Sequence, residues 1–442
     1  MEIRLDPMQG YVKEDGKFDL KKALISSGVK AAICYKETID NIAVSPSMVR
    51  EMESDKILLN RGLNTLRDQH STPNEHQVVS LEITGIPKAF LMVLNNEKQY
   101  TADERSLRYT EVEPNDIISE KEVELYNKWL KIIEENITEK YLKLYTKTSG
   151  SEKRARSTIH KLAQENARYM VSVFTPTTTT YTVPWIQINK VISYMEKVIK
   201  NPIDEFEKRL VPYFDEFIAK LKDLNVSLTY KNLYDAIKDD EEILEFIKTK
   251  HPNIIENKDS NDLYYKNTKD VELSLFANRN KFSGINSDNI YGASISYNNY
   301  ESFACLAHEN RHRSIECEML IPKEFRFFVP PILTEEQKKE WEKDMLSVKD
   351  VFPQGQLLKV NRIMSIRAML KFVAQERACE RAQLEIQDIY TNDIIPTVHE
   401  NLVKTNKELA KEVKYYVGRL RCGYPGYKCP GTCGRPRIKR DI

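Results

Sequence analysis

The feature of this sequence that most limits its fold is an order of elements that occurs twice. In the first half, residues 80–98 (SLEITGIPKAFLMVLNNEK) read as a strand, a short apolar helix and a polar cluster. In the second half, residues 288–313 (DNIYGASISYNNYESFACLAHENRHR) repeat this order. Aligning Asn96 with Arg311 sets the segments about 215 residues apart, a length at which internal similarity indicates a duplicated domain. A chain of 442 residues can hold two such domains.

The hydrophobic pattern predicts a helix-rich α+β fold. Residues 77–86 alternate apolar and polar side chains, which is the period of a strand with one buried face. Residues 120–147, 186–222 and 357–388 carry apolar residues at helical spacing and predict long helices. We therefore expect two tandem halves, each with a mixed or antiparallel sheet and long helices.

Composition and pattern divide the chain into four segments. Residues 225–285 separate the halves, because they are rich in Asn, Asp and Lys and show little periodicity. Near the end, Cys422, Cys429 and Cys433 lie among glycines and prolines, which suits either reduced structural thiols or a zinc knuckle. Thiols are favoured because no fourth ligand is evident, so we expect no metal site. The segments are a first half (1–224), a linker or insertion (225–285), a shortened second half (286–420) and a basic tail (421–442).

The charge balance restricts the class of partner. Lys and Arg number 67 against 66 for Asp and Glu, so no overall charge attracts nucleic acid or an anionic membrane. Any anion site must therefore be local. No apolar run is long enough to span a bilayer, and the first twenty residues lack the core of a signal peptide. We expect a cytoplasmic protein that binds a small molecule, with neither a membrane nor a nucleic acid as partner.

The segment TADERSLRY (residues 101–109) spaces three polar side chains by two residues. In an extended chain Glu104, Ser106 and Arg108 point to one side, where they offer an acceptor, a hydroxyl and a guanidinium group. Such a set suits a phosphorylated small molecule, with the arginine as the fork for phosphate. The alternative is a solvated strand edge with an ordinary Glu–Arg pair, which this segment taken alone favours.

Upstream of the first predicted strand, HSTPNEH contributes His70, Glu75 and His76. Their spacing fits neither the i, i+4 pair of a helical metal site nor a Cys/His knuckle. A loop histidine followed by a Glu–His pair more readily orients a planar ligand than holds a metal.

Residues 311–313 (RHR) place two arginines and a histidine side by side at the predicted end of a short helix. Consecutive basic residues cannot all share one partner, so they suit two phosphates, or a phosphate and a ring carbonyl. The alternative is a solvated basic corner. Its acidic partners would be Glu309, Glu316 and Glu318.

Taken in order, these motifs resemble the flavin-dependent thymidylate synthases, whose signature reads Arg-His-Arg-x-x-Ser-x-Asn-Glu-x-Ser-x-Arg-Tyr. Residues 96–109 (NEKQYTADERSLRY) keep the back of this signature, and residues 311–319 (RHRSIECEM) keep its front. Further family landmarks are Arg168 in QENARYM, Asn189 in PWIQINKVI, and Arg377 and Gln383 in ERACERAQLEIQ.

The resemblance implies an enzyme that binds FAD, takes reducing equivalents from NADPH, and uses methylenetetrahydrofolate to convert dUMP to dTMP. The family's sites lie between subunits of a homotetramer, so in a fused pair of diverged copies each half need keep only the residues that it lends to a shared site. By carry-over, the nucleotide site comprises Glu104, Ser106, Arg108, Arg168, Arg377 and Gln383, with Ser106 and Arg377 in the catalytic role. The flavin site comprises His70, Glu75, Asn189, Arg311, His312 and Arg313.

The divided signature leaves two other functions open. One is a related enzyme that modifies C5 of another pyrimidine nucleotide, for example by hydroxymethylation. The other is a paralogue that binds a nucleotide without turnover. In each case the expected assembly is a homodimer of pseudo-dimeric chains, the counterpart of the family's tetramer.

Overall fold

A computed structural model describes most of the chain. The described residues are 1–35, 44–67, 72–96, 99–107, 112, 117–227, 263–267, 293–424, 427, 429, 433, 435–436 and 441–442. His70 and Arg108, two of the predicted site residues, and most of the predicted linker lie outside this set. Among the described helices, none combines the length and the apolar character needed to cross a membrane. The cysteines whose side chains are described form no disulfide.

The chain forms two compact units, which are described separately. Unit 1 comprises Met1–Arg105 and Pro176–Lys250, and unit 2 comprises Ser106–Thr175 and His251–Ile442. The units do not follow the two halves of the sequence, because residues 106–175 of the first half fold with the second half. The boundaries predicted for the four sequence segments stay a prediction.

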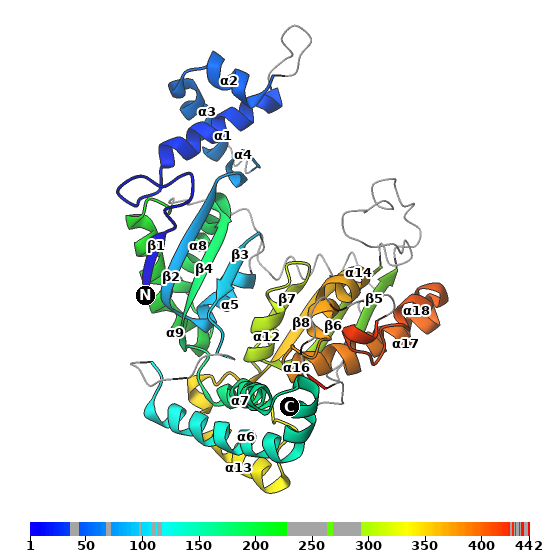
Figure 1. Cartoon of the computed structure of the whole chain (residues 1–442). Helices are drawn as coiled ribbons and strands as arrows, with labels where there is room; N and C mark the ends of the chain where they lie inside the picture. The colour runs from blue at the N-terminus through cyan, green and yellow to red at the C-terminus, as the bar shows by residue number, and fades with distance from the viewer. Residues whose placement is uncertain are drawn as a thin grey trace. The chain divides into compact units, whose positions relative to one another are not determined.

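Unit 1 contains an antiparallel sheet with the strand order β1-β2-β4-β3 (Figure 1). Its strands are β1 (Glu2–Leu5), β2 (Val78–Pro87), β3 (Thr101–Glu104) and β4 (Pro176–Pro184). Strand β2 confirms the strand predicted over residues 77–86, with Val79, Leu81 and Ile83 buried. Strand β4 (PTTTTYTVP) was not predicted, although its threonines are typical of strands.

Aromatic contacts hold the sheet-covering helices of unit 1 together. The helices are α5 (Lys88–Asn96), α8 (Trp185–Lys200) and α9 (Glu205–Asp223), so the single helix predicted over 186–222 is two helices. The ring of Phe90 on α5 lies 5.1 Å from that of Phe214 and 5.0 Å from that of Phe217, both on α9. From β4, the buried Tyr181 hydroxyl donates to the backbone oxygen of Leu94 at 3.0 Å.

Four further helices precede β2, and two of them cross closely. They are α1 (Leu20–Tyr35), α2 (Pro46–Met52), α3 (Asp55–Arg67) and α4 (Thr72–Glu75). A Cβ added at Gly28 of α1 would lie 1.9 Å from the Leu58 backbone oxygen, and one at Gly62 of α3 would lie 2.1 Å from that of Leu24. The glycines therefore let the two helix backbones touch.

Unit 2 contains a second antiparallel sheet, with the order β5-β6-β8-β7. Its strands are β5 (Leu263–Asn267), β6 (Ala293–Ser302), β7 (Glu316–Leu320) and β8 (Leu357–Ser365). The long helix predicted over 357–388 is wrong at its start, because residues 357–365 form the central strand β8. The segments that follow are α14 (Ile366–Ala368), η5 (Met369–Val373), α15 (Ala374–Arg377), α16 (Leu384–Asp388), η6 (Ile389–Ile394), α17 (Ile395–Thr405), α18 (Lys407–Val413) and η7 (Arg421–Gly423).

A helical layer from both halves of the sequence completes unit 2. From the first half come α6 (Glu120–Ser149), which confirms the helix predicted there, α7 (Glu152–Ala167) and η1 (Arg168–Met170); α6 and α7 lie side by side (Figure 1). From the second half come α12 (Phe303–Glu309), α13 (Glu335–Ser347) and η4 (Lys349–Val351). The Trp129 and Trp341 rings pack edge to face at 4.9 Å, and Trp129 Nε1 donates to Asp344 Oδ2 at 2.9 Å.

The two sheets have the same strand order and matching positions along the chain. Strands β2 and β6 have the same length, and each leads directly into a helix. The alignment that matches their first residues, Val78 and Ala293, also matches Glu120 and Glu335, the first residues of α6 and α13. Both of these helices begin with a capping box. The corresponding elements therefore keep one spacing from the start of β2 or β6 to the start of α6 or α13.

Beyond the start of these helices, the second half is shorter than the first. In the first half α6 is followed by α7 and η1 before the chain enters β4. In the second half η4 alone lies between α13 and β8, a stretch that the structure describes in full. The second half therefore has no counterpart of one long helix of the first.

Corresponding residues of the two halves pair with each other inside unit 2. Val173 N donates to Phe352 O at 2.8 Å, and Gln354 N donates to Val171 O at 2.8 Å. An antiparallel bridge joins residues 172 and 353 between these two bonds. Aligning the first residues of β4 and β8 matches residues 171–173 with residues 352–354, so each segment pairs with its own counterpart. The junction thus has the pattern of a local two-fold axis.

We expect Gly28→Ala to destabilise unit 1 by about 1–3 kcal/mol, the usual cost of overpacking, even after the gain in helix propensity. The added methyl group would force α1 and α3 apart. Urea unfolding measures the loss. Gly10→Ala is the matched control, because nothing lies within 4 Å of its added Cβ. Equal stability of the two variants would contradict the close crossing.

Candidate functional site

The predicted site residues that the structure describes fall into both units. Unit 1 holds Glu75, Glu104 and Asn189. Unit 2 holds Ser106, Arg168, Arg311, His312, Arg313, Arg377 and Gln383. The contacts within unit 2 bring several of these together, so the site is built from there.

In unit 1, the predicted ligand residues Glu104 and Asn189 have partners within the protein. Glu104, at the end of β3, accepts a hydrogen bond from Lys88 Nζ. Asn189 is buried in α8, and its Nδ2 donates to the backbone oxygens of Trp185 at 2.9 Å and Val226 at 3.2 Å. Glu75 is half-buried at the end of α4. Their roles toward nucleotide and flavin stay predictions.

In unit 2, Arg168 from the first half meets Gln383 from the second. Arg168 Nη2 donates to Gln383 Oε1, and Gln383 Nε2 donates to the hydroxyl of Tyr169. Tyr169 in turn donates to Glu385 Oε2 at 2.8 Å. All four side chains are buried. Arg168 and Gln383, two of the six residues that the sequence assigns to the nucleotide site, thus belong to one hydrogen-bonded chain although they lie far apart in the sequence.

Glu385 is the acceptor on which this chain ends. Its carboxylate also accepts from Ser302 N at 2.7 Å and from Ser302 Oγ at 2.5 Å, and Ser302 caps α12. Burial raises the pKa of Glu385, while its hydrogen bonds with Ser302 and Tyr169 act in the opposite direction. Burial also raises the pKa of Tyr169 well above its ordinary value, so its hydroxyl keeps the proton that it donates.

Arg377 and His312 form a second contact at the end of α12. Arg377 Nε donates to His312 Nε2 at 2.7 Å, and Arg377 Nη2 donates to His308 O at 2.8 Å. His312 Nε2 is the acceptor in this contact, so Arg377 orients the imidazole ring. Arg311 is half-buried and Arg313 is exposed. The end of α12 therefore carries Arg311 and Arg313 beside a histidine whose ring is oriented by Arg377.

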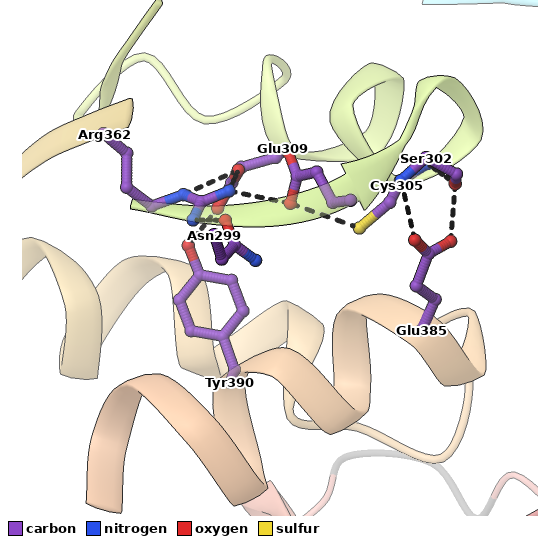
Figure 2. Close-up of polar contacts among 8 residues, drawn as sticks. Asn299, Ser302, Cys305, Glu309, Arg362, Glu385 and Tyr390 are labelled. Carbon is purple, nitrogen blue, oxygen red and sulfur yellow. Dashed lines mark hydrogen bonds and ion pairs between the residues drawn. The ribbon is translucent and has the colours of Figure 1, made fainter. Parts of the chain in front are cut away.

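A fully buried ionic cluster involves the last residue of α12. The sequence pattern did not predict it. Figure 2 shows Arg362 of β8 pointing toward Glu309 and Asn299. Arg362 donates to Glu309 Oε2 from Nε at 2.9 Å and from Nη2 at 2.6 Å. It also donates to Glu301 Oε2 at 2.7 Å and to Asn299 Oδ1. Glu309 is thus the buried partner of Arg362, rather than a surface partner of residues 311–313.

The cluster has more carboxyl groups than cations. Tyr390 donates to Glu309 Oε1, and Cys305 Sγ lies 3.6 Å from Glu301 Oε2. Burial raises the pKa of Glu301 well above its ordinary value, and the charges of Glu309 and Glu385 add to this against the opposing effect of Arg362. Burial thus favours the neutral acid form of Glu301.

One signal in the sequence could have revealed this cluster. In LLKVNRIMS the alternate residues Leu358, Val360, Arg362 and Met364 are all buried, so an arginine occupies an inward position of a strand. The charged residue interrupts the alternation of apolar side chains, so the apolar pattern alone does not indicate a strand here.

We expect the free energy of unfolding of unit 2 to fall as the pH rises through the raised pKa of Glu301. In the unfolded chain this carboxyl group titrates near its ordinary value of 4.5, whereas the folded protein holds the proton to higher pH. The contribution is therefore complete below 4.5 and is lost as the folded group ionises.

A pH series of urea unfolding tests this expectation through the difference between variants. Glu301→Gln keeps the shape and removes the titration, so its stability should depend less on pH than that of the native protein. Glu316→Gln, on the exposed side of β7, is the control. Identical pH profiles for native protein and Glu301→Gln would contradict the protonated state of Glu301.

The geometry can be compared with known families. Residues 25–188 match the family model described as "Thymidylate synthase complementing protein". No curated protein sequence shows significant similarity to the chain. The matched segment runs from α1 to α8 and includes Glu104, Ser106 and Arg168. Residues 25–188 are therefore similar to the flavin-dependent thymidylate synthase family, whose members are enzymes of thymidylate synthase type.

Proposed function

We propose that the protein is a flavin-dependent thymidylate synthase that reductively methylates dUMP to dTMP, with methylenetetrahydrofolate as one-carbon donor and NADPH as reductant. One observation carries the proposal: the hydrogen bond between Arg168 and Gln383. It joins a family residue kept only in the first half to one kept only in the second. Two halves that had each lost function independently would have no reason to retain complementary residues in contact.

The residues at the end of α12 fit the phosphates of FAD by their chemistry. Arg311 and Arg313 are not buried, and a guanidinium group is suited to binding phosphate oxygens through two parallel N–H bonds. The His312 ring is oriented by its contact with Arg377, which suits it to a fixed hydrogen bond with a ligand. When bound, FAD would supply the hydride for the reduction.

The chain's own residues would contribute binding, orientation and charge stabilisation. Arg168, fixed by Gln383, would orient the nucleotide, with Ser106 of the same unit as a further ligand. The Arg377 guanidinium would stabilise negative charge on the pyrimidine carbonyl as it develops. No nucleophilic side chain is required by this arrangement, since positioning and electrostatics lower the barrier.

The proposal includes a tandem duplication. Its support is the shared strand order, the shared spacing of corresponding elements and the reciprocal hydrogen bonds between residues 171–173 and 352–354. These bonds are what an interface between two identical subunits would leave behind after fusion. We propose a homodimer of such chains as the counterpart of the family's tetramer.

A second candidate is an enzyme that modifies C5 of another pyrimidine nucleotide, for example by hydroxymethylation. The replaced signature residues favour it, because residues 96–98 read NEK and residues 316–319 read ECEM where the family has other residues. A non-catalytic nucleotide-binding paralogue is the outcome to expect if neither nucleotide is converted.

We expect purified protein to retain FAD after removal of excess, with visible flavin bands that bleach on adding NADPH and dUMP. Arg313→Ala should lose most of the retained flavin while leaving the melting temperature unchanged, because Arg313 is exposed. Arg326→Ala, an exposed arginine paired with Glu324 in the same unit, is the control and should retain FAD. A colourless native protein would remove the basis for the flavin site.

We expect dUMP to raise the melting temperature of the native protein, since a ligand that binds only the folded state stabilises it. Arg168→Lys should reduce this shift, because lysine cannot reproduce the planar contact with Gln383. Exposed Arg156→Lys on α7 is the matched control. A larger shift with another pyrimidine nucleotide than with dUMP would favour the second candidate.

A further inference from the structure

We propose that Arg362 is a positioning residue for the basic segment Arg311–Arg313, acting through Glu309. The role of that segment in binding flavin phosphates rests on the proposed function. The positioning itself is a property of the chain and can be measured without a ligand.

The first step is the attachment of α12 to the sheet. Glu309 is the last residue of α12, and its carboxylate accepts two hydrogen bonds from Arg362 and one from Tyr390. The side chains of Arg362 and Glu309 are completely buried. A guanidinium–carboxylate pair joined by two hydrogen bonds fixes orientation as well as distance, so it sets where α12 ends and in which direction the chain leaves it.

The second step links this attachment to the basic segment. His312 N donates to Glu309 O at 2.8 Å, and Asn310 N donates to Leu306 O at 2.9 Å. The turn after α12 is therefore built on the backbone of the residue that Arg362 holds. On the other side, Arg377 bonds to His308 O and to the His312 ring. Arg362 and Arg377 thus hold the same helix end from two directions.

The third step is a comparison within the chain. Aligning β2 with β6 and β4 with β8 gives the first-half counterparts of Glu301, Glu309 and Arg362, which are Ile86, Leu94 and Tyr181. There the Tyr181 hydroxyl bonds to the Leu94 backbone oxygen, and Ile86 and Leu94 are buried apolar side chains. Both halves hold the helix end from the central strand. Only the half that keeps the Arg-His-Arg motif uses buried charges at these positions.

This difference argues for a role beyond stability. A buried ion pair must overcome a large desolvation cost, and well-packed apolar residues at the same positions are often equally stable or more so. In the first half, the same arrangement of strands and helix carries uncharged side chains at these three positions. The second half retains the buried ion pair beside residues 311–313 despite its desolvation cost. This is explained if a rigid, directional contact is needed there.

The test replaces three residues of the second half with their counterparts from the first half. The triple variant Glu301→Ile, Glu309→Leu, Arg362→Tyr removes the charges together and should fold, with a melting temperature near or above the native one. Its affinity for FAD should fall by about tenfold or more, the effect typical of residues that orient a ligand-binding group. Arg362→Ala alone is less informative, because it leaves buried carboxyl groups unpaired and so destabilises the fold.

Hydrogen exchange provides the readout that does not depend on a ligand. In the ligand-free triple variant, amides of residues 310–315 should exchange faster than in native protein, because local opening of the turn costs less. Tyr181→Phe in the first half is the control and should leave both this exchange and FAD affinity unchanged.

The outcomes separate the two proposals. If the native protein binds no FAD but the triple variant still shows faster exchange at residues 310–315, the flavin assignment fails and the positioning role stands. If native protein binds FAD, and the folded triple variant has native affinity or native exchange at these residues, Arg362 is not a positioning residue. Failure of the triple variant to fold would also overturn the proposal, because the cluster would then be required for the fold itself.

Discussion

The buried carboxylate of Glu385 is the interaction on which the arrangement of unit 2 depends. A buried carboxylate must have its acceptors satisfied, and those of Glu385 are satisfied by Tyr169 from the first half and Ser302 from the second. Through Tyr169 it fixes Gln383 and, with it, Arg168. Through Ser302 it fixes the start of α12. A single acceptor thus determines where two separate parts of the candidate site can lie.

The two halves show that one backbone framework accepts two core chemistries. Around α5 the contacts are aromatic, with Phe90, Phe214 and Tyr181, whereas around α12 they are ionic, with Glu301, Glu309 and Arg362. The strand order is the same in both, because pairing is set by backbone hydrogen bonds and by the alternation of buried positions. The residues that fill those positions are then free to diverge toward separate tasks.

This division explains how a split signature can remain useful. In a symmetric assembly every subunit must carry every site residue, whereas in a fused pair each half carries only its share. The contact of Arg168 with Gln383 is consistent with such sharing in unit 2. The reciprocal bonds between residues 171–173 and 352–354 join segments from the two halves of the sequence.

The sequence by itself determined the helix-rich α+β class, the repeated order of elements and the strand at β2, because apolar periodicity and internal similarity are local properties that survive without neighbours. It also selected Arg168, Gln383, Arg377 and His312, since these match motifs. Only the tertiary structure decided that residues 106–175 fold with the second half, that residues 357–365 form a strand, and that Glu309 pairs with Arg362. The physical reason is the same in each case: these outcomes depend on which partner, distant in sequence, satisfies a buried charge or backbone group, and no local pattern encodes that partner.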